Sequence, residues 1–239
     1  MDTLDLRQGY YSASGIITKR TISPKGDIFL NLFLKGFGII WVIAPGSAKG
    51  KVRFGGALEP STWGVFTLYK GPTNFYLKTV EVKVDSWELR HRPRGLKTYF
   101  SLLQLINSLL PQGHPDDELL VHLFWARDLL IRDCHMELVE WRFLWRWLKV
   151  WGLAPAIDSC QACSRKISEG YITSEGFVCP ACLTEGRERS FPSINLHVLK
   201  KAAMLSRDSI PDFSREITEI HIAQLRRANI MLRDILKKQ

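Results

Sequence analysis

The chain has 239 residues, of which 46% are hydrophobic and 24% charged, as in an ordinary globular protein. Its first residues are polar and its apolar runs are short, so we expect no signal peptide or membrane span, and a cytosolic protein with reduced thiols. The net charge of +9 divides into +5 over residues 1–87, zero over 88–158 and +4 over 159–239. This excess of basic residues favours an anionic partner, most often nucleic acid, or else a solvated surface that only keeps the protein soluble.

Residues 1–87 have the pattern of β structure. Segments rich in β-branched and aromatic residues, separated by Gly and Pro, predict five strands: Ser14–Thr18, Asp27–Leu34, Gly38–Ala44, Gly64–Tyr69 and Tyr76–Val84. Five short strands in about 85 residues fit a closed barrel better than an open sheet, whose edges would pair with other chains. We therefore predict an OB-fold β-barrel over residues 1–87.

An α-helical domain should follow the barrel, in two parts, residues 88–158 and 191–239. Helical spacing of apolar residues predicts helices over the segments Tyr99–Leu110, Pro115–Arg132, His135–Trp151, Ser193 onwards and Ser214–Leu236. The third helix carries four of the eight tryptophans, which indicates burial in a bundle, while a partner-binding surface is the alternative. Gly152 is placed to end that helix.

Two C-x-x-C pairs separated by fifteen residues lie between these parts: Cys160, Cys163, Cys179 and Cys182. Four soft thiolates at this spacing can surround one Zn²⁺ as a tetrahedron, and a disulfide framework is the alternative. Such a site leaves no open position for substrate, so we predict one structural zinc ion in a module over residues 159–190, inserted in the helical domain. Residues 170–178 should form its hairpin. The fifth cysteine, Cys134, in a helical stretch, should be a small buried hydrophobic residue.

Basic residues gather at predicted turns of the barrel and just after it. We predict that DNA contacts come from Lys19, Arg20, Lys25, Lys35, Lys49, Lys51, Arg53, Arg90, Arg92 and Arg94. The last three should lie on an extended linker, because the residue before a proline avoids the helical region. Aromatic residues are interleaved with them, each one by itself more typical of the core than of a base-stacking surface: Phe29, Phe33, Phe37, Trp41, Phe54 and Trp63.

A short acidic motif, His114-Pro-Asp-Asp-Glu118, matches the metal-binding motif of a family of zinc-dependent deacetylases. Here it follows a predicted amphipathic helix and enters another, and its residues are those preferred in the first turn of a helix. We therefore interpret it as a helix start, with a hydrolase that holds a second metal on His114 and Asp117 as the alternative. The chain has no recognisable catalytic motif, and we expect a protein that is not an enzyme.

The order of parts, a basic barrel followed by a helical domain with an inserted four-cysteine module, resembles the RecO family of bacterial DNA-repair and recombination mediators. Local segments agree with that family: Gly15-Ile-Ile-Thr-Lys-Arg, Gly26-Asp-Ile-Phe-Leu-Asn-Leu-Phe and Ala48-Lys-Gly-Lys-Val-Arg-Phe-Gly-Gly-Ala-Leu-Glu-Pro. The chain departs from it in Pro24-Lys-Gly-Asp, where the family often has an acidic residue after the first strand, and in its Trp-rich helix.

The resemblance implies a non-enzymatic mediator of the RecF pathway on the bacterial nucleoid. Such proteins bind single- and double-stranded DNA without sequence specificity, anneal complementary strands and help load the recombinase RecA onto DNA coated with single-strand-binding protein. It also implies RecR and the acidic, Phe-ended tail of single-strand-binding protein as partners, and phosphate contacts at five matched positions: Lys19, Arg20, Lys49, Lys51 and Arg53. A zinc-containing adaptor that docks proteins, with an incidental basic surface, is the competing hypothesis.

Overall fold

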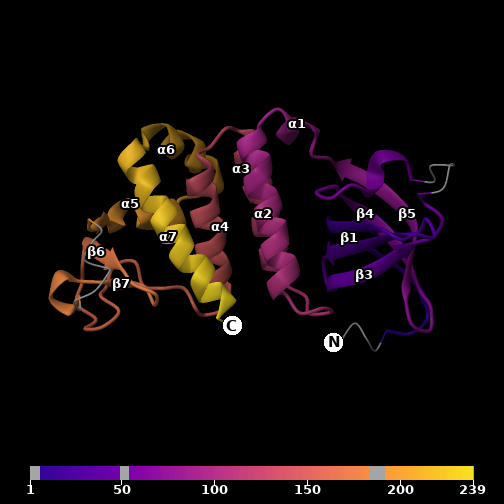
Figure 1. Cartoon of the computed structure of the whole chain (residues 1–239), viewed down its shortest axis with the longest axis horizontal. Coiled ribbons are helices and arrows are strands. Elements are labelled where there is room, and N and C mark those ends of the chain that lie inside the picture. The colour runs from indigo at the N-terminus through magenta and orange to yellow at the C-terminus, as the bar shows by residue number, and fades with distance from the viewer. Residues whose placement is uncertain (1–5, 49–53, 184–191, 239) are drawn as a thin grey trace. The chain divides into compact units, whose positions relative to one another are not determined.

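The computed structural model describes residues 6–48, 54–183 and 192–238. The chain divides into two compact units, Met1–Val121 and His122–Gln239. The first unit contains the larger β-sheet, and the second contains most of the helices and a small sheet, so the fold is of the α+β class (Figure 1). No helix in the described part of the chain has the length and apolar character needed to cross a membrane.

The larger sheet is a closed five-stranded barrel in which the strands follow the order β1-β2-β3-β5-β4. Its strands are β1 (Gly9–Ile22), β2 (Ile28–Leu34), β3 (Gly38–Ala44), β4 (Trp63–Lys70) and β5 (Phe75–Val84). The β3–β5 pair is parallel and the other pairs are antiparallel. All five predicted strands are confirmed. The first is longer than predicted, because its first half pairs with β4 and its second half with β2.

Every second side chain along each strand points inward, and these inward side chains form the barrel core. The inward positions of β2 carry Ile28, Leu30, Leu32 and Leu34, all fully or almost fully buried. A short 3₁₀ turn, η2 (Gly55–Leu58), adds Leu58 to the same core. Burying each of these side chains contributes about 1.5–3 kcal/mol, so the barrel has a core of its own.

Two helices follow the barrel within the first unit, α1 (Trp87–Arg90) and α2 (Pro93–Leu109). The prediction of an extended linker over Arg90, Arg92 and Arg94 is therefore wrong. Arg90 ends α1 and Arg94 lies in the first turn of α2. The restriction imposed by Pro93 falls only on Arg92, the N-cap residue, because proline itself is well suited to the first helical position.

Helix α2 is fastened to the barrel by polar contacts through one asparagine. The Asn107 Oδ1 accepts hydrogen bonds from Thr18 Oγ1 at 2.8 Å and from Asn31 Nδ2 at 2.9 Å. Deeper in the unit, Trp63 Nε1 donates to the Tyr99 hydroxyl at 3.0 Å. Because these groups are buried or partly buried, each bond offsets a desolvation cost and fixes how α2 crosses β1 and β2.

The remaining elements form the second unit, which α3 enters from the first. The helices are α3 (Asp117–Ile131), α4 (Met136–Val150), α5 (Leu196–Met204), α6 (Ile210–Glu216) and α7 (Glu219–Lys237), with the 3₁₀ turns η3 (Pro180–Cys182) and η5 (Arg207–Ser209). The long helix predicted from Ser214 is wrong: it is two helices, because Thr218 caps α7 in a box with His221. The predicted N-cap Ser193 is also wrong, since Asn195 Oδ1 accepts from the amide of His197 at the start of α5.

Helix α4 lies at the centre of this unit, as its tryptophans predict. Trp141 and Trp147 are fully buried, and Gly152 adopts the positive φ of 74° that ends the helix. Helix α7 packs along α4 through two ion pairs, Arg226–Glu137 at 2.8 Å and Arg233–Glu140 at 2.6 Å.

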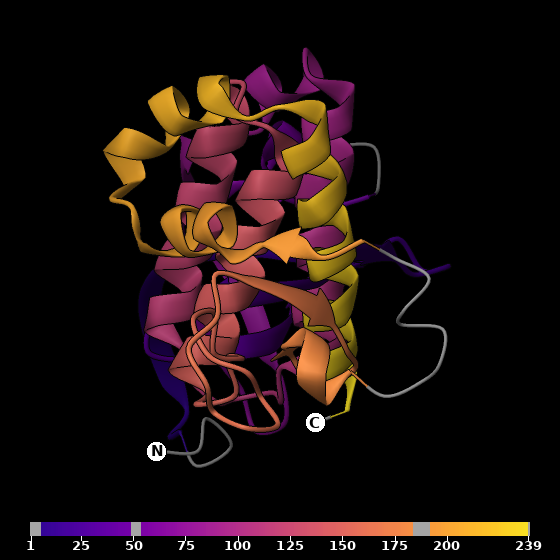
Figure 2. The same cartoon turned by 90° about the vertical axis from the view of Figure 1, so that its left-hand side faces the viewer.

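The small sheet carries the cysteine-rich segment against these helices (Figure 2). Its strands are β6 (Glu169–Ile172), β7 (Phe177–Val178) and β8 (Ile194–Asn195), in the order β7-β6-β8. The predicted hairpin is thus confirmed as β6 and β7. Phe177 is fully buried and packs on Trp141 with ring centroids 6.4 Å apart, so the segment docks directly on α4.

Candidate metal centre and nucleic-acid interface

The four cysteines are brought together by the hairpin and the turns at its ends. Cys160 and Cys163 belong to a turn in which the amide of Ser164 donates to the carbonyl of Cys160, and Ser164 has a positive φ of 59°. Cys179 follows β7, and Cys182 ends the 3₁₀ turn η3. The amide of Gln161 donates to the carbonyl of Phe177, which aligns the first turn with the second.

The geometry of the cluster fits a metal ion. All four Sγ atoms lie within 4.8 Å of one another, and Cys163 and Cys179 are 3.9 Å apart. Metal–sulfur bonds of ~2.3 Å in a tetrahedron place the sulfurs ~3.8 Å apart, so little adjustment is needed. The amide of Cys179 donates to Cys160 Sγ at 3.3 Å, as expected for a negatively charged sulfur. The cluster could therefore hold a metal ion that prefers sulfur ligands.

The thiols of the cluster differ in acidity. Hydrogen bonding from the backbone of Cys179 lowers the pKa of Cys160 to about 6. Hydrogen bonds with the side chains of Cys163 and Cys179 raise the pKa of Cys182 to about 12. A cluster that already contains one thiolate can start to bind a cation at neutral pH, and it must lose its remaining protons to complete the site.

Only some of the barrel residues predicted to contact DNA lie together in the structure. Lys19, Lys25 and Lys35 are exposed, the first at the end of β1 and the others in the turns before and after β2. Arg20 is half-buried and pairs with Glu59 at 3.3 Å. Three further predicted contacts fall outside the described residues: Lys49, Lys51 and Arg53.

A groove of about 440 Å³ opens between the end of β1 and helix α2. Its lining combines cationic, polar and apolar groups: Thr18, Lys19, Arg20, Pro60, Phe100, Leu103, Gln104, Asn107 and Ser108. The volume lies within the usual range of ligand sites. Of the predicted contacts, the structure places Lys19 and Arg20 together here, whereas Lys25 and Lys35 do not line this groove.

The arginines after the barrel lie on helices. Arg90 is exposed, with its guanidinium 5.3 Å from the centre of the Trp87 ring. Arg94 is exposed in the first turn of α2, and Arg92 is half-buried at its N-cap. These side chains reach solvent from a rigid helical backbone, so they cannot follow a phosphate chain as an extended linker would.

The acidic motif at residues 114–118 serves to start a helix. Asp116 Oδ1 accepts from the amide of Leu119 at 2.9 Å, and Asp117 Oδ1 accepts from the amide of Gly36 at 2.7 Å. His114 Nδ1 lies 3.1 Å from the carbonyl oxygen of Gln112. In the described part of the chain, the four cysteines are the only group of three or more His, Cys, Asp and Glu side chains placed to hold a metal. The helix-start interpretation is confirmed, and the structure gives the hydrolase alternative no second metal site there.

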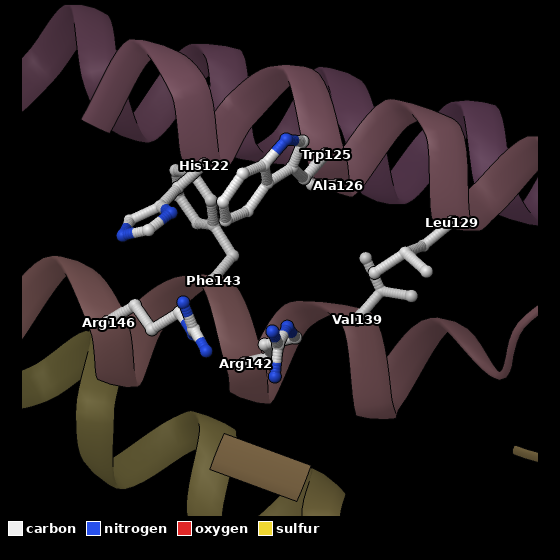
Figure 3. Close-up of a pocket in the computed structure, with 8 residues that line it drawn as sticks. All are labelled: His122, Trp125, Ala126, Leu129, Val139, Arg142, Phe143 and Arg146. Atoms are coloured by element: carbon white, nitrogen blue, oxygen red, sulfur yellow. The ribbon is translucent and has the colours of Figure 1, made fainter. Parts of the chain in front are cut away.

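A narrow pocket lies between α3 and α4 in the second unit. Figure 3 shows His122 and Trp125 of α3 facing Phe143 of α4, with Arg142 and Arg146 along the same side of α4. Burial lowers the pKa of Arg142 to about 10, which still leaves it charged at neutral pH. Its Nη1 donates to the carbonyl of Ala202 at 3.0 Å, at the end of α5. The pocket has a volume of about 10 Å³, enough for one water molecule.

Sequence patterns did not identify several residues that shape these sites. Beside the end of β1 lie Glu59, which follows the 3₁₀ turn η2, and two residues of α2, Gln104 and Asn107. Asn107 is one of three polar residues, with Gln104 and Ser108, in the otherwise apolar last two turns of α2, and this position is the only signal of it in the sequence.

Comparisons with known proteins agree with this architecture. A family model described as "Recombination protein O C terminal" matches residues 99–228, more than half of the chain. A protein of Caldanaerobacter subterraneus subsp. tengcongensis is 23% identical over 240 aligned positions, covering 92% of this chain and 93% of its own length. Another from Desulforamulus reducens is 25% identical, covering 80% and 76%, and one from Rubrobacter xylanophilus is 26% identical, covering 76% and 75%. Each of the three is named "DNA repair protein RecO".

Proposed function

Because the chain belongs to the RecO family of DNA repair proteins, we propose that it is a recombination mediator that binds single- and double-stranded DNA without reading sequence. In this proposal it anneals complementary strands and helps load RecA onto DNA coated with single-strand-binding protein. It works beside RecR, in the cytoplasm of a bacterium and on its nucleoid, and catalyses no covalent chemistry.

The observation that carries this proposal is the groove at the end of β1, with Lys19 and Arg20 in its wall. Annealing needs a surface that neutralises two phosphate chains and leaves the bases free to pair. Cations on a rigid barrel supply such a surface, and Lys25 adds an exposed cation in the turn after β1. The partial pairing of Arg20 with Glu59 holds its guanidinium at the groove.

We propose that residues 1–87 form an OB-fold. The five-stranded closed barrel, in which β1 pairs with both β2 and β4, supports this assignment. The residues that follow, 88–158 and 191–239, would be one helical domain that begins with α1 and α2 inside the first compact unit and is interrupted by the module over residues 159–190.

For the metal we propose one structural Zn²⁺. Four thiolates at tetrahedral spacing suit zinc and leave no position for a substrate, so the ion would join the two turns and do no chemistry. The ligands would be Cys160, Cys163, Cys179 and Cys182.

The acidic, Phe-ended tail of single-strand-binding protein needs an apolar site with basic groups beside it. The pocket between α3 and α4 offers aromatic side chains of Trp125 and Phe143 together with Arg142 and Arg146. Its volume of about 10 Å³ is too small for a phenyl ring, so we propose that the tail docks there only after a lining side chain moves.

Titration of labelled oligonucleotides at several salt concentrations tests DNA binding. We expect affinity to be similar for unrelated sequences and to fall steeply with salt, because bound phosphates release counterions. Lys19→Gln should reduce the slope of log K against log salt by about 0.7 on single strands, whereas Lys237→Gln, on the exposed end of α7, should leave it unchanged. Indifference to DNA at low salt, or a strong preference for one sequence, would contradict the proposal and favour the adaptor.

A further inference from the structure

One outward face of the barrel presents two rows of side chains across β1, β2 and β3. In the first row Lys19 lies opposite Asn31, and Asn31 lies opposite Trp41. In the second row the partners are Thr21, Phe29 and Ile43. Directly paired residues point to the same side of a sheet, and every second residue along a strand does so too. The six side chains therefore share the face opposite the barrel core.

The aromatic members of this face form an exposed pair. Trp41 is 45% exposed in the middle of its strand, and Phe29 is half-buried beside it. Their ring centroids are 6.2 Å apart and the ring planes are tilted by 57°, so the two rings do not stack on each other. Asn31, between them in sequence, bonds to Asn107 of α2. An indole at this position exposes apolar surface that the described part of the first unit leaves uncovered.

Charge around the pair favours nucleic acid over an apolar protein partner. None of the six positions is acidic, and Lys19 stands in the same row as Trp41. Lys25 is exposed in the turn that joins β1 to β2, while Asp27 of that turn uses its Oδ1 to accept from the amide of Gly46 at 2.7 Å. Aromatic faces with cations near them are what unpaired bases and their phosphates bind, because every base has a π-face and every linkage a charge.

We propose that Trp41 and Phe29 form a stacking platform for unpaired bases, with Lys19 and Lys25 binding the adjoining phosphates. This inference rests on the proposed DNA-binding function and assigns it to one barrel face. It predicts a difference between substrates: bases in a duplex are already stacked and paired, so the platform should act on single strands alone. Lys19 also lines the groove beside α2, so one cation serves the platform and the groove.

Removing one ring at a time tests the platform. Trp41→Ala should weaken binding of single-stranded oligonucleotides about tenfold, leave duplex binding unchanged and leave the salt slope unchanged, since no cation is lost. Trp41→Phe, which keeps an aromatic face, should recover most of the affinity. Tyr10→Ala is the matched control: Tyr10 is 69% exposed and pairs with Tyr69 across strands at 5.2 Å, but on β1 and β4. Thermal melts of all three variants check that the barrel still folds.

The outcomes separate the platform from DNA binding itself. If the unaltered chain binds no DNA, the proposed function fails. If it binds DNA but Trp41→Ala binds single strands as tightly as Tyr10→Ala does, the platform is overturned and the rings only stabilise the sheet. The same conclusion follows if Trp41→Ala weakens duplex binding as much as it weakens single-strand binding. Loss of self-association on Trp41→Ala, seen by light scattering without a change in DNA affinity, would instead assign the face to a second copy of the chain. Ultraviolet crosslinking of an oligonucleotide containing 5-iodouracil should attach at Trp41 or Phe29, and attachment elsewhere alone contradicts the platform.

Discussion

Cys134 illustrates how burial decides the chemistry of a single residue. It lies in the turn between α3 and α4, outside the helices, and is 7% exposed. It is buried, as predicted from the sequence, although not within a helix. Burial raises the pKa of its thiol to about 11, so at neutral pH it stays a neutral, unreactive group.

This raised pKa gives a prediction with a definite sign. The folded state favours the protonated thiol, so its contribution to stability is complete below a pH of about 9, the ordinary pKa, and is lost as the pH rises through about 11. At pH 8, iodoacetamide should modify Cys134 in the folded, metal-loaded chain at least about a hundredfold more slowly than in denaturant, as measured by mass spectrometry. Equal rates in the two states would show that the thiol is neither buried nor shifted.

At the residue scale, local spacing decided what could be predicted. The four cysteines were identifiable because both pairs lie within turns of four residues and the hairpin between them is short. Glu59 and Asn107 were not, because their partners Arg20, Thr18 and Asn31 are distant in sequence and are brought to them only by the closed barrel and α2. Trp41 was only one of several aromatic candidates until its exposed position on β3 was known.

At the scale of elements, the cysteine module should depend on a bound metal ion more than on packing. Its buried cluster is small, with Cys160 and Cys179 themselves among its members beside Val178 and Leu183. The barrel, by contrast, has a large apolar core. Metal binding and local folding should therefore be coupled in the module and independent of the barrel.

Cys160→Ser tests that coupling. The variant should lose the one zinc ion per chain that we propose for the unaltered protein, and hydrogen exchange should quicken in β6 and β7 while the barrel amides stay protected. Cys134→Ser is the control and should keep its metal, since Cys134 is not part of the cluster. A full zinc content in Cys160→Ser, or equal loss of protection in the barrel, would show that the module is not organised in this way.

The elements that sequence patterns predicted well are those whose pattern is local. The barrel strands were located by the alternation of apolar and polar residues and by the Gly and Pro residues that separate the strands. Helix α4 was located by the helical spacing of its tryptophans. Where prediction failed, a short-range rule was applied too widely. Pro93 restricts the backbone conformation of only the residue before it, so Arg90 and Arg94 remain helical. The break between α6 and α7 depends on a capping box at Thr218 that apolar periodicity does not reveal.

At the scale of the whole molecule, the sequence predicted the order of parts but not how they group. The predicted barrel ends at residue 87, yet the first compact unit continues to Val121, because α2 packs on β1. A groove between a barrel strand and a helix that follows it could not be predicted from either alone. DNA binding is proposed for the first unit, in which residues 1–87 carry a net charge of +5, and protein docking for the second.

The most direct test of the central claim is the annealing rate of complementary strands coated with single-strand-binding protein. We predict that the chain accelerates annealing, that Lys19→Glu reduces the acceleration about tenfold or more, and that removing the acidic tail of single-strand-binding protein abolishes it on coated strands but not on naked ones. No acceleration by the unaltered chain, or full acceleration by Lys19→Glu, would contradict a mediator that works through its barrel.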